Sequence, residues 1–148
     1  MIAIAADHGG YALKEEVKKY LEEVGIEYKD FGTDSEERTD YPVHAKPAIE
    51  AVQNKECEKA ILICGTGFGM TIFANKFKGI YCASCWNEDV GRLLKEHNNA
   101  NVIALPGRFI NISQAVPILR AWLGSEFLAG RYTERLQMIE EIEKENMK

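Results

Sequence analysis

The sequence predicts a three-layer α/β protein, in which a five-stranded parallel sheet lies between two layers of helices in a Rossmann-like arrangement. Short apolar runs typical of buried strands alternate with segments whose apolar residues recur at helical spacing. The connections between the runs are long enough to hold a crossover helix, which parallel strands require. With 148 residues and 46% hydrophobic content, the chain can build one buried core but not two ordinary domains, so residues 1–148 are expected to form a single domain.

The first part of the chain is expected to fold as strand, helix, strand and helix. Residues 2–6 are apolar and uncharged, and Gly25 stands where a glycine commonly ends a helix. A polar, turn-rich segment separates the second strand from a helix that Pro42 can open. The expected elements are a strand at 2–6, a helix carrying Leu13, Val17, Leu21 and Val24, a strand at 26–31, and a helix carrying Ile49 and Val52.

The rest of the chain continues this alternation. Residues 60–64 are typical of a strand buried on both faces, because the run is apolar and rich in β-branched residues. The further elements expected are a helix from Met70, a strand at 79–83, a helix at 88–96, a strand at 102–105, and helices at 113–123 and 133–145. Ligands bind beyond the carboxyl ends of parallel strands, so Asp7 and His8, after the first strand, should lie near Cys64, after the third.

Composition and charge exclude several classes of protein. The net charge of −5 and the pI near 5.3 argue against a general surface for nucleic acid or for an anionic membrane. The sequence contains no signal-like or membrane-length apolar run. Its four cysteines are scattered rather than arranged as a disulfide framework, which predicts a reducing, cytoplasmic environment.

The loop after the third strand, CGTGFGM, begins at Cys64. Its three glycines can take positive φ or let a ligand approach where a Cβ would block it. The helix that follows presents unpaired N–H groups, which favour an anion. Established phosphate motifs do not fit. A Walker A loop would close with Gly-Lys-Ser/Thr, a G-x-G-x-x-G dinucleotide motif needs glycine at Met70, and the C-x5-R loop of cysteine phosphatases needs arginine there.

Motifs spread along nearly the whole chain point to one family. They are DHGG near the start, then SEERTDYP, ICGTGFGMTIFANK, EHNNAN, PGR and GRYTER. Together they resemble the ribose-5-phosphate isomerase B family. The resemblance implies an isomerase that interconverts ribose 5-phosphate and ribulose 5-phosphate on a Rossmann-like fold, with no metal or other cofactor. It also implies a small phosphorylated sugar as the partner and a site built at a homodimer interface, with a tetramer as the alternative.

Aldose–ketose isomerisation needs a base that moves a proton between C2 and C1, and donors that stabilise the enediolate in between. Cys64 resembles the family's base, and a helix N-terminus favours the thiolate that such a base requires. Another branch of the family places a glutamate base at the position of Met70, and methionine cannot remove a proton. Thr66 resembles the family residue that hydrogen-bonds substrate oxygens. The alternatives are a buried structural cysteine and a threonine hydroxyl that satisfies the loop backbone.

His97 resembles the family's ring-opening acid, with Asp7 as a helper on the opposite loop. A histidine at this place could instead interact with the carbonyls of a helix end. The family's phosphate contacts match His8, Arg131 and Arg135, although an arginine pair at i and i+4 is usually a solvated helix face. The remaining substrate contacts that the resemblance implies are Gly65, Gly67, Phe68, Gly69, Asn98 and Arg108. Tyr41 could line the pocket as a further contact or simply pack.

Two further features have more than one interpretation. Cys82 and Cys85 form a C-x-x-C pair that could serve redox or zinc chemistry, but the first cysteine is expected inside a strand and no second pair supplies more ligands. The apolar stripe that includes Ile118, Trp122, Phe127 and Leu128 could be core or a dimer surface.

Departures from the family pattern leave the substrate open. Ala129 and Tyr132 replace the first glycine and the histidine of the usual GGRH, and Phe73 and Tyr81 replace a common alanine and arginine. These changes could favour a hexose 6-phosphate, such as allose or galactose 6-phosphate, whereas His97 favours the pentose. A non-catalytic sensor of phosphorylated sugars is the alternative from another class, because fold alone does not fix function.

Overall fold

The computed structural model describes residues 1–147, so residue 148 of the expected domain lies outside the described residues. Five parallel strands form one sheet, as the sequence predicts, in the order β2-β1-β3-β5-β4. The central three are buried almost throughout because helices cover both faces. The strands are β1 (Ile2–Ala6), β2 (Tyr28–Asp30), β3 (Lys59–Cys64), β4 (Cys82–Ser84) and β5 (Val102–Pro106).

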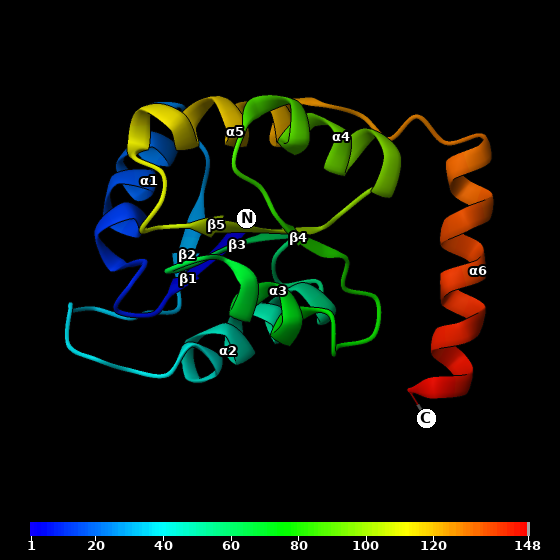
Figure 1. Ribbon diagram of the computed structural model, residues 1–148, viewed down its shortest axis with the longest axis horizontal. Helices are drawn as coiled ribbons and strands as arrows, with labels where there is room; N and C mark the ends of the chain where they lie inside the picture. Colours follow the sequence, from blue (N-terminus) through cyan, green and yellow to red (C-terminus); the bar gives the residue numbers. More distant parts are fainter. Residues whose placement is uncertain (148) are drawn as a thin grey trace.

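The helices form two layers and one outlying element (Figure 1). One face of the sheet is covered by α1 (Tyr11–Glu23), α4 (Glu88–Asn98) and α5 (Ile112–Gly124), and the other by α2 (Tyr41–Gln53) and α3 (Phe68–Ala74). The last helix, α6 (Arg131–Asn146), stands beside the β4 edge, and none of its described residues is buried. Among residues 1–147, no helix has both the length and the apolar character needed to cross a bilayer.

Several element boundaries differ from the prediction. The strand expected at 79–83 starts at Cys82, because the Tyr81 N–H is held by the Asn101 side chain rather than by a neighbouring strand. The helix expected from Met70 begins at Phe68, where Gly67, at φ 80°, turns the chain directly into the first helical turn. The strand expected at 26–31 is shorter, and the last helix begins at Arg131 instead of residue 133.

The part of the apolar stripe that lies on α5 belongs to the core, whereas Leu128, after the end of this helix, is 57% exposed. Ile118 and Trp122 are fully buried, and the Trp122 Nε1–H donates to the Ala100 carbonyl over 3.2 Å. A dimer surface centred on Trp122 is therefore excluded. Any subunit contact must use other apolar residues.

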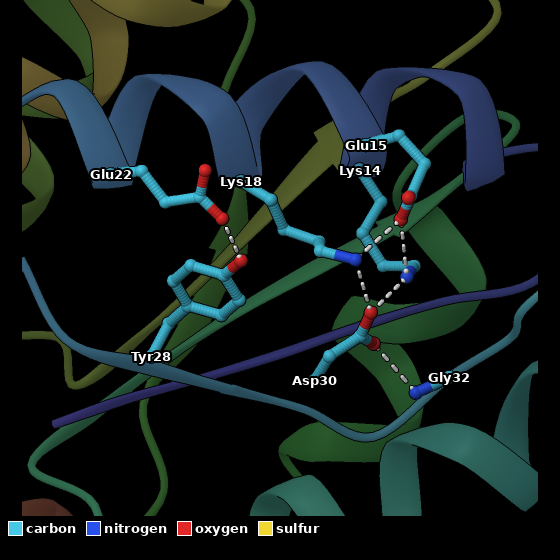
Figure 2. A network of polar contacts seen from close by, with 7 residues as sticks. All are labelled: Lys14, Glu15, Lys18, Glu22, Tyr28, Asp30 and Gly32. Carbon is cyan, nitrogen blue, oxygen red and sulfur yellow. Dashed lines mark hydrogen bonds and ion pairs between the residues drawn. The ribbon is translucent and has the colours of Figure 1, made fainter.

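A polar network ties the start of α1 to the end of β2 (Figure 2). The Lys14 side chain is fully buried, and its ammonium donates to Asp30 Oδ2 over 2.6 Å and to Glu15 Oε2 over 3.0 Å. Lys18 donates to the same two carboxylates, while Asp30 Oδ1 accepts the Gly32 N–H over 2.8 Å. Burial acts to raise the pKa of Asp30, but hydrogen bonds from both lysines and from Gly32 outweigh it, so the pKa lies below its ordinary value.

Replacing Asp30 with asparagine should destabilise the fold near neutral pH, because Lys14 would keep a buried charge with one carboxylate fewer. Asp30 is partly exposed, so we expect a loss of about 1 to 3 kcal/mol in the free energy of unfolding. Urea denaturation of both proteins over a pH series measures this difference.

The pH series carries its own check. The lowered pKa of Asp30 means that its contribution is present above the ordinary aspartate pKa of about 4 and is lost as the pH falls through the folded-state pKa. The difference between wild type and Asp30→Asn should therefore shrink below about pH 4. A difference that stayed constant into acid would show that the Asp30 charge is not involved. Glu56→Gln removes the exposed pair with Lys29 and should change stability little.

Candidate active site

Three loops meet at the carboxyl edge of the sheet, after β1, β3 and β5. A Cβ placed on Gly9 would lie 3.1 Å from the Gly65 nitrogen and 3.3 Å from Arg108 Nε. The loops are joined by backbone hydrogen bonds, from the Gly107 N–H to the Cys64 carbonyl over 2.8 Å and from the Arg108 N–H to the Gly65 carbonyl over 3.0 Å. The predicted meeting of the loops after the first and third strands is thus observed, and the PGR segment joins them.

Asp7 is held by contacts within its own loop, and His8 by a contact with a residue far away in the sequence. Asp7 is buried, and its Oδ1 accepts the Gly9 and Gly10 N–H groups over 2.9 and 3.2 Å. His8 Nδ1 lies 3.1 Å from the Thr39 carbonyl oxygen and 3.2 Å from the Thr39 nitrogen, so it donates or accepts according to its tautomer. Both side chains are therefore fixed in place before a ligand binds.

The glycine loop is ordered by its own threonine. Thr66 Oγ1 accepts the Phe68 N–H over 3.1 Å, which matches the alternative in which the hydroxyl satisfies the loop backbone. The same hydroxyl still has a proton to donate to a ligand. Ser84 Oγ donates to the Thr66 carbonyl over 3.2 Å and so fixes the loop from β4. With the Phe68 N–H taken in this way, the next two N–H groups of the first turn of α3, those of Gly69 and Met70, have no partner within the helix and remain suited to an anion.

Cys64 ends β3 at the base of this loop and is buried, with 5% of its surface exposed. Met70, where another branch of the family has its base, is fully buried in the core on the α2 and α3 side. Cys64 is thus the one side chain of the loop that can ionise and so remove and return a proton. Because Cys64 is buried, a ligand can reach its thiol only through the loops above it.

Tyr41, the first residue of α2, lies against the glycine loop. A Cβ on Gly69 would approach Tyr41 Cζ to 2.7 Å, so glycine is required for this contact. Beside the loop is an apolar hollow of about 270 Å³, whose lining residues are Thr66, Phe68, Ser84, Trp86, Pro106 and Phe109.

A second group of predicted site residues lies at the opposite edge of the sheet. His97 is in the last turn of α4, which leads into the start of β5 at Val102, whereas Cys64 pairs with Pro106 at the end of β5. At about 3.3 Å per residue, the length of β5 alone separates these two ends by roughly 13 Å. Asp7 therefore cannot assist His97 within one chain, and the predicted site is split into two halves.

The second half is gathered around one tyrosine. His97 stacks on Tyr132 with ring centroids 4.3 Å apart and an interplanar angle of 12°. Arg131 Nη2 donates to the Tyr132 hydroxyl over 3.1 Å, and the Arg135 guanidinium lies 5.8 Å from the same ring. Asn98, the next residue of α4, borders the gap between α4 and α6. The residue expected to open the sugar ring and two of the three expected to bind phosphate, Arg131 and Arg135, therefore lie together, apart from Cys64. The third, His8, lies in the Cys64 half.

Cys82 and Cys85 lie in the interior. Burial raises the pKa of each thiol to about 12, so neither forms a thiolate near neutral pH. Cys82 is the first residue of β4 rather than of a helix, in agreement with its expected place in a strand. Residues 1–147 contain no group of three or more side chains arranged to hold a metal ion. The pair thus lacks the geometry of a thioredoxin-type or zinc site.

Comparison with known proteins identifies the family. The model of the ribose/galactose isomerase family matches residues 2–139. The chain belongs to this family. Ribose-5-phosphate isomerase B of Escherichia coli is 43% identical over 142 residues, covering 96% of this chain and 95% of that protein. A 4-deoxy-4-sulfo-D-erythrose isomerase of a Clostridium species is 39% identical over 137 residues, covering 92% and 83% of the two chains.

Solved structures of ribose/galactose isomerases agree with this fold. The ribose-5-phosphate isomerase B of Clostridium thermocellum superposes with a TM-score of 0.95 at 45% identity, over 97% of each chain. That of Mycoplasma genitalium, solved with bound ribulose-5-phosphate, has a TM-score of 0.92 at 35% identity and covers 98% of this chain and 97% of that one. The predicted Rossmann-like α/β fold is confirmed. The protein is a sugar-phosphate isomerase.

Sequence reasoning missed several residues that shape this isomerase site. Thr39 holds His8, although the two are 31 residues apart, and Ser84 holds the glycine loop from another strand. Neither position carries a local signal. Tyr132 departs from the family pattern in the sequence, but its contact with His97 depends on where α6 lies.

Gly107→Ala should impair the isomerase by disturbing the junction of its loops. A Cβ on Gly107 would lie 2.8 Å from the Gly9 carbonyl oxygen and 3.0 Å from Gly10 Cα, both backbone atoms that cannot rotate away. We expect a loss of about 1 to 3 kcal/mol in stability from overpacking, with a fall in kcat/KM of tenfold or more, because the loops carrying Asp7 and Arg108 must separate. Urea denaturation and sugar-phosphate turnover measure the two effects.

Gly124→Ala is the matched control. The added methyl group would meet nothing within 4 Å, so both stability and turnover should stay close to wild type. Unchanged turnover in Gly107→Ala would mean that the loop junction does not set the geometry of the site.

Proposed function

We propose that the chain is a ribose-5-phosphate isomerase that interconverts ribose 5-phosphate and ribulose 5-phosphate through an enediolate. The observation that carries the proposal is the place of Cys64, at the end of β3, under a glycine loop joined to the Asp7 and Arg108 loops. A non-catalytic sensor would need the glycine loop and the arginines but not a thiol. The ribose-5-phosphate isomerase B relatives and the neighbour solved with ribulose-5-phosphate support this choice of substrate.

In this mechanism the Cys64 thiolate removes the proton from C2 of the open aldose and returns it to C1. The C–H electron pair forms a C1–C2 double bond and the carbonyl pair moves to the oxygen on C1, giving an enediolate. A proton then passes from the hydroxyl on C2 to the oxygen on C1, the electrons left on the C2 oxygen form the ketone, and C1 takes the proton back from the Cys64 thiol. The developing negative charge faces the N–H groups of the glycine loop and the Thr66 hydroxyl proton. The fixed loop gives these donors little reorganisation to undergo during the reaction.

We assign ring opening to His97, which under this proposal would act on the substrate from a second copy of the chain. Because His97 and Cys64 lie at opposite edges of one sheet, a complete site requires the His97 half of one protomer to meet the Cys64 half of another. A two-fold homodimer would form two such sites by the same contact. The same arrangement would bring Arg131 and Arg135 to a phosphate that His8 and Arg108 also approach.

Exposed apolar surfaces support the dimer. Phe68 and Phe109, on either side of the 270 Å³ hollow beside the glycine loop, are 65% and 72% exposed. On α6, the side chains of Met138, Ile139 and Ile142 are also largely exposed. Two such surfaces on a small protein are typical of an interface between chains. Trp122 plays no part in it.

A hexose 6-phosphate is the alternative substrate. The observation that favours it is Tyr132, which places a phenol beside His97 where the family commonly has an imidazole. Phe73 does not contribute to this alternative, because its ring packs edge-on against Phe77 at 5.2 Å. The relative that isomerises a sulfonated four-carbon sugar supports the view that this family tolerates different chain lengths and anions.

The unpaired state of all four cysteines is compatible with the proposed cytoplasmic location.

The separate roles of Cys64 and His97 can be tested because only the aldose must be opened. Ribulose 5-phosphate cannot close a furanose ring, since the oxygen on C5 carries the phosphate. We expect His97→Asn to slow conversion of ribose 5-phosphate by about 10²- to 10⁴-fold, while ribulose 5-phosphate still exchanges its C1 proton with deuterated water. Cys64→Ala should abolish both reactions. Proton NMR follows both in one sample.

Equal loss of exchange in the two variants would show that His97 acts on the enediolate itself. Exchange that persisted in Cys64→Ala would remove the cysteine from the role of base. Running the same assay with allose 6-phosphate and galactose 6-phosphate decides between pentose and hexose.

Heterodimers test whether the sites are shared. Cys64→Ala and His97→Asn chains, co-expressed with different tags, give heterodimers in which one site carries both substitutions and the other carries neither. Such heterodimers should recover about half of the wild-type turnover of ribose 5-phosphate, because one site of two is intact. If each site were built within a single chain, both sites of the heterodimer would be defective and no activity would return.

A further inference from the structure

Tyr132 is the common contact of His97, to which the proposed mechanism gives ring opening, and of Arg131 and Arg135, to which it gives phosphate binding. Its ring stacks on His97 at 4.3 Å, its hydroxyl accepts from Arg131 over 3.1 Å, and its π face is approached by both arginines, at 5.1 Å from Arg131 and 5.8 Å from Arg135. His97 comes from α4 and the other residues from the first two turns of α6. One phenol therefore joins two helices that otherwise pack loosely.

Few other contacts hold His97, α6 or the two arginines in place. Within residues 1–147, the His97 ring makes no hydrogen bond to another protein group, so stacking is the contact that limits rotation of the imidazole about χ2. The helix α6 buries none of its described residues, and a gap of about 280 Å³ lined by Leu94, Asn98, Leu136 and Ile139, among others, remains between it and the body. Arg131 and Arg135 are exposed, long side chains that lose much freedom on binding an anion.

We propose that Tyr132 is a positioning residue that holds His97 and Arg131 as one unit, with a fixed separation between the ring-opening imidazole and the phosphate-binding guanidinium. The stack sets the plane of the imidazole, and the hydroxyl sets the direction of the guanidinium. Both groups are then presented together to the Cys64 half of a partner subunit. This inference rests on the proposed function, from which it takes the tasks of His97 and Arg131.

Two substitutions separate the two contacts. Tyr132→Phe keeps the stack and removes the acceptor for Arg131, so KM for both sugars should rise a few-fold while kcat for ribose 5-phosphate changes little. Tyr132→Ala removes the stack as well, so kcat for ribose 5-phosphate should fall about tenfold or more relative to C1-proton exchange of ribulose 5-phosphate. A merely structural residue would lower both reactions together.

A readout that does not need activity follows the stack directly. In the wild type and in Tyr132→Phe, the imidazole proton resonances of His97 should be moved upfield by the ring current of the stacked ring, and in Tyr132→Ala this shift should disappear. His97→Asn assigns the resonances. Tyr28→Ala is the matched control, because Tyr28 is on β2 at the far edge of the sheet from α6, and neither the shift nor the ratio of the two reactions should change.

The outcomes are distinct. If Tyr132→Ala loses the upfield shift but keeps the wild-type ratio of ring opening to exchange, or if Phe and Ala variants behave alike, Tyr132 does not position His97 and the inference is wrong. In those cases the proposed function stands. If the wild type neither isomerises nor exchanges either sugar, the proposed function fails and the inference fails with it.

Discussion

The direction of the strands is the constraint on which the rest of this structure depends. All five strands point the same way, so the ends of β1, β3 and β5 deliver Asp7, Cys64 and Arg108 to one edge. The helices must run back along the sheet, so α4 ends at the other edge and carries His97 with it. No side-chain rotation can close a separation set by the length of a strand. A chain of this topology holds both halves of the proposed site, but never against each other.

The carboxyl edge is kept rigid by contacts that lie outside the site. Asp30 accepts the Gly32 N–H, the Gly32 carbonyl accepts from Ala6 over 2.7 Å, and the Thr33 N–H returns to Ala6 over 2.7 Å. Ala6 is the residue before Asp7. A fully buried lysine, Lys14, thus stabilises the position of a residue at the site through one carboxylate and a run of backbone bonds (Figure 2). A charge buried in this way costs stability unless it is paired. Lys14 must therefore keep its carboxylate partners, and this holds the network in one arrangement.

Much of the fold and one half of the site could be predicted from the sequence, because strand polarity and apolar period are local signals. His97 precedes the fifth strand in the sequence, so the same rule puts it at the opposite edge, whereas the family resemblance implies Asp7 as its helper. Trp122 shows another limit, since apolar spacing on a helix does not distinguish core from interface. Contacts such as His8 with Thr39 join residues far apart in sequence, and no local pattern encodes them.

The helix α6 explains why its part of the site was the least predictable. A helix is normally located by the apolar face that it buries, and α6 buries none of its described residues within its own chain. Its first turns nevertheless carry Tyr132, whose ring stacks on His97, and the two arginines near that ring, Arg131 and Arg135. Under the proposed function, the apolar surface that would order this helix belongs to a second copy of the chain. Assembly would then be required for catalysis, because a separated monomer would hold the proposed base with His97, Arg131 and Arg135 at the opposite edge of its sheet instead of beside it.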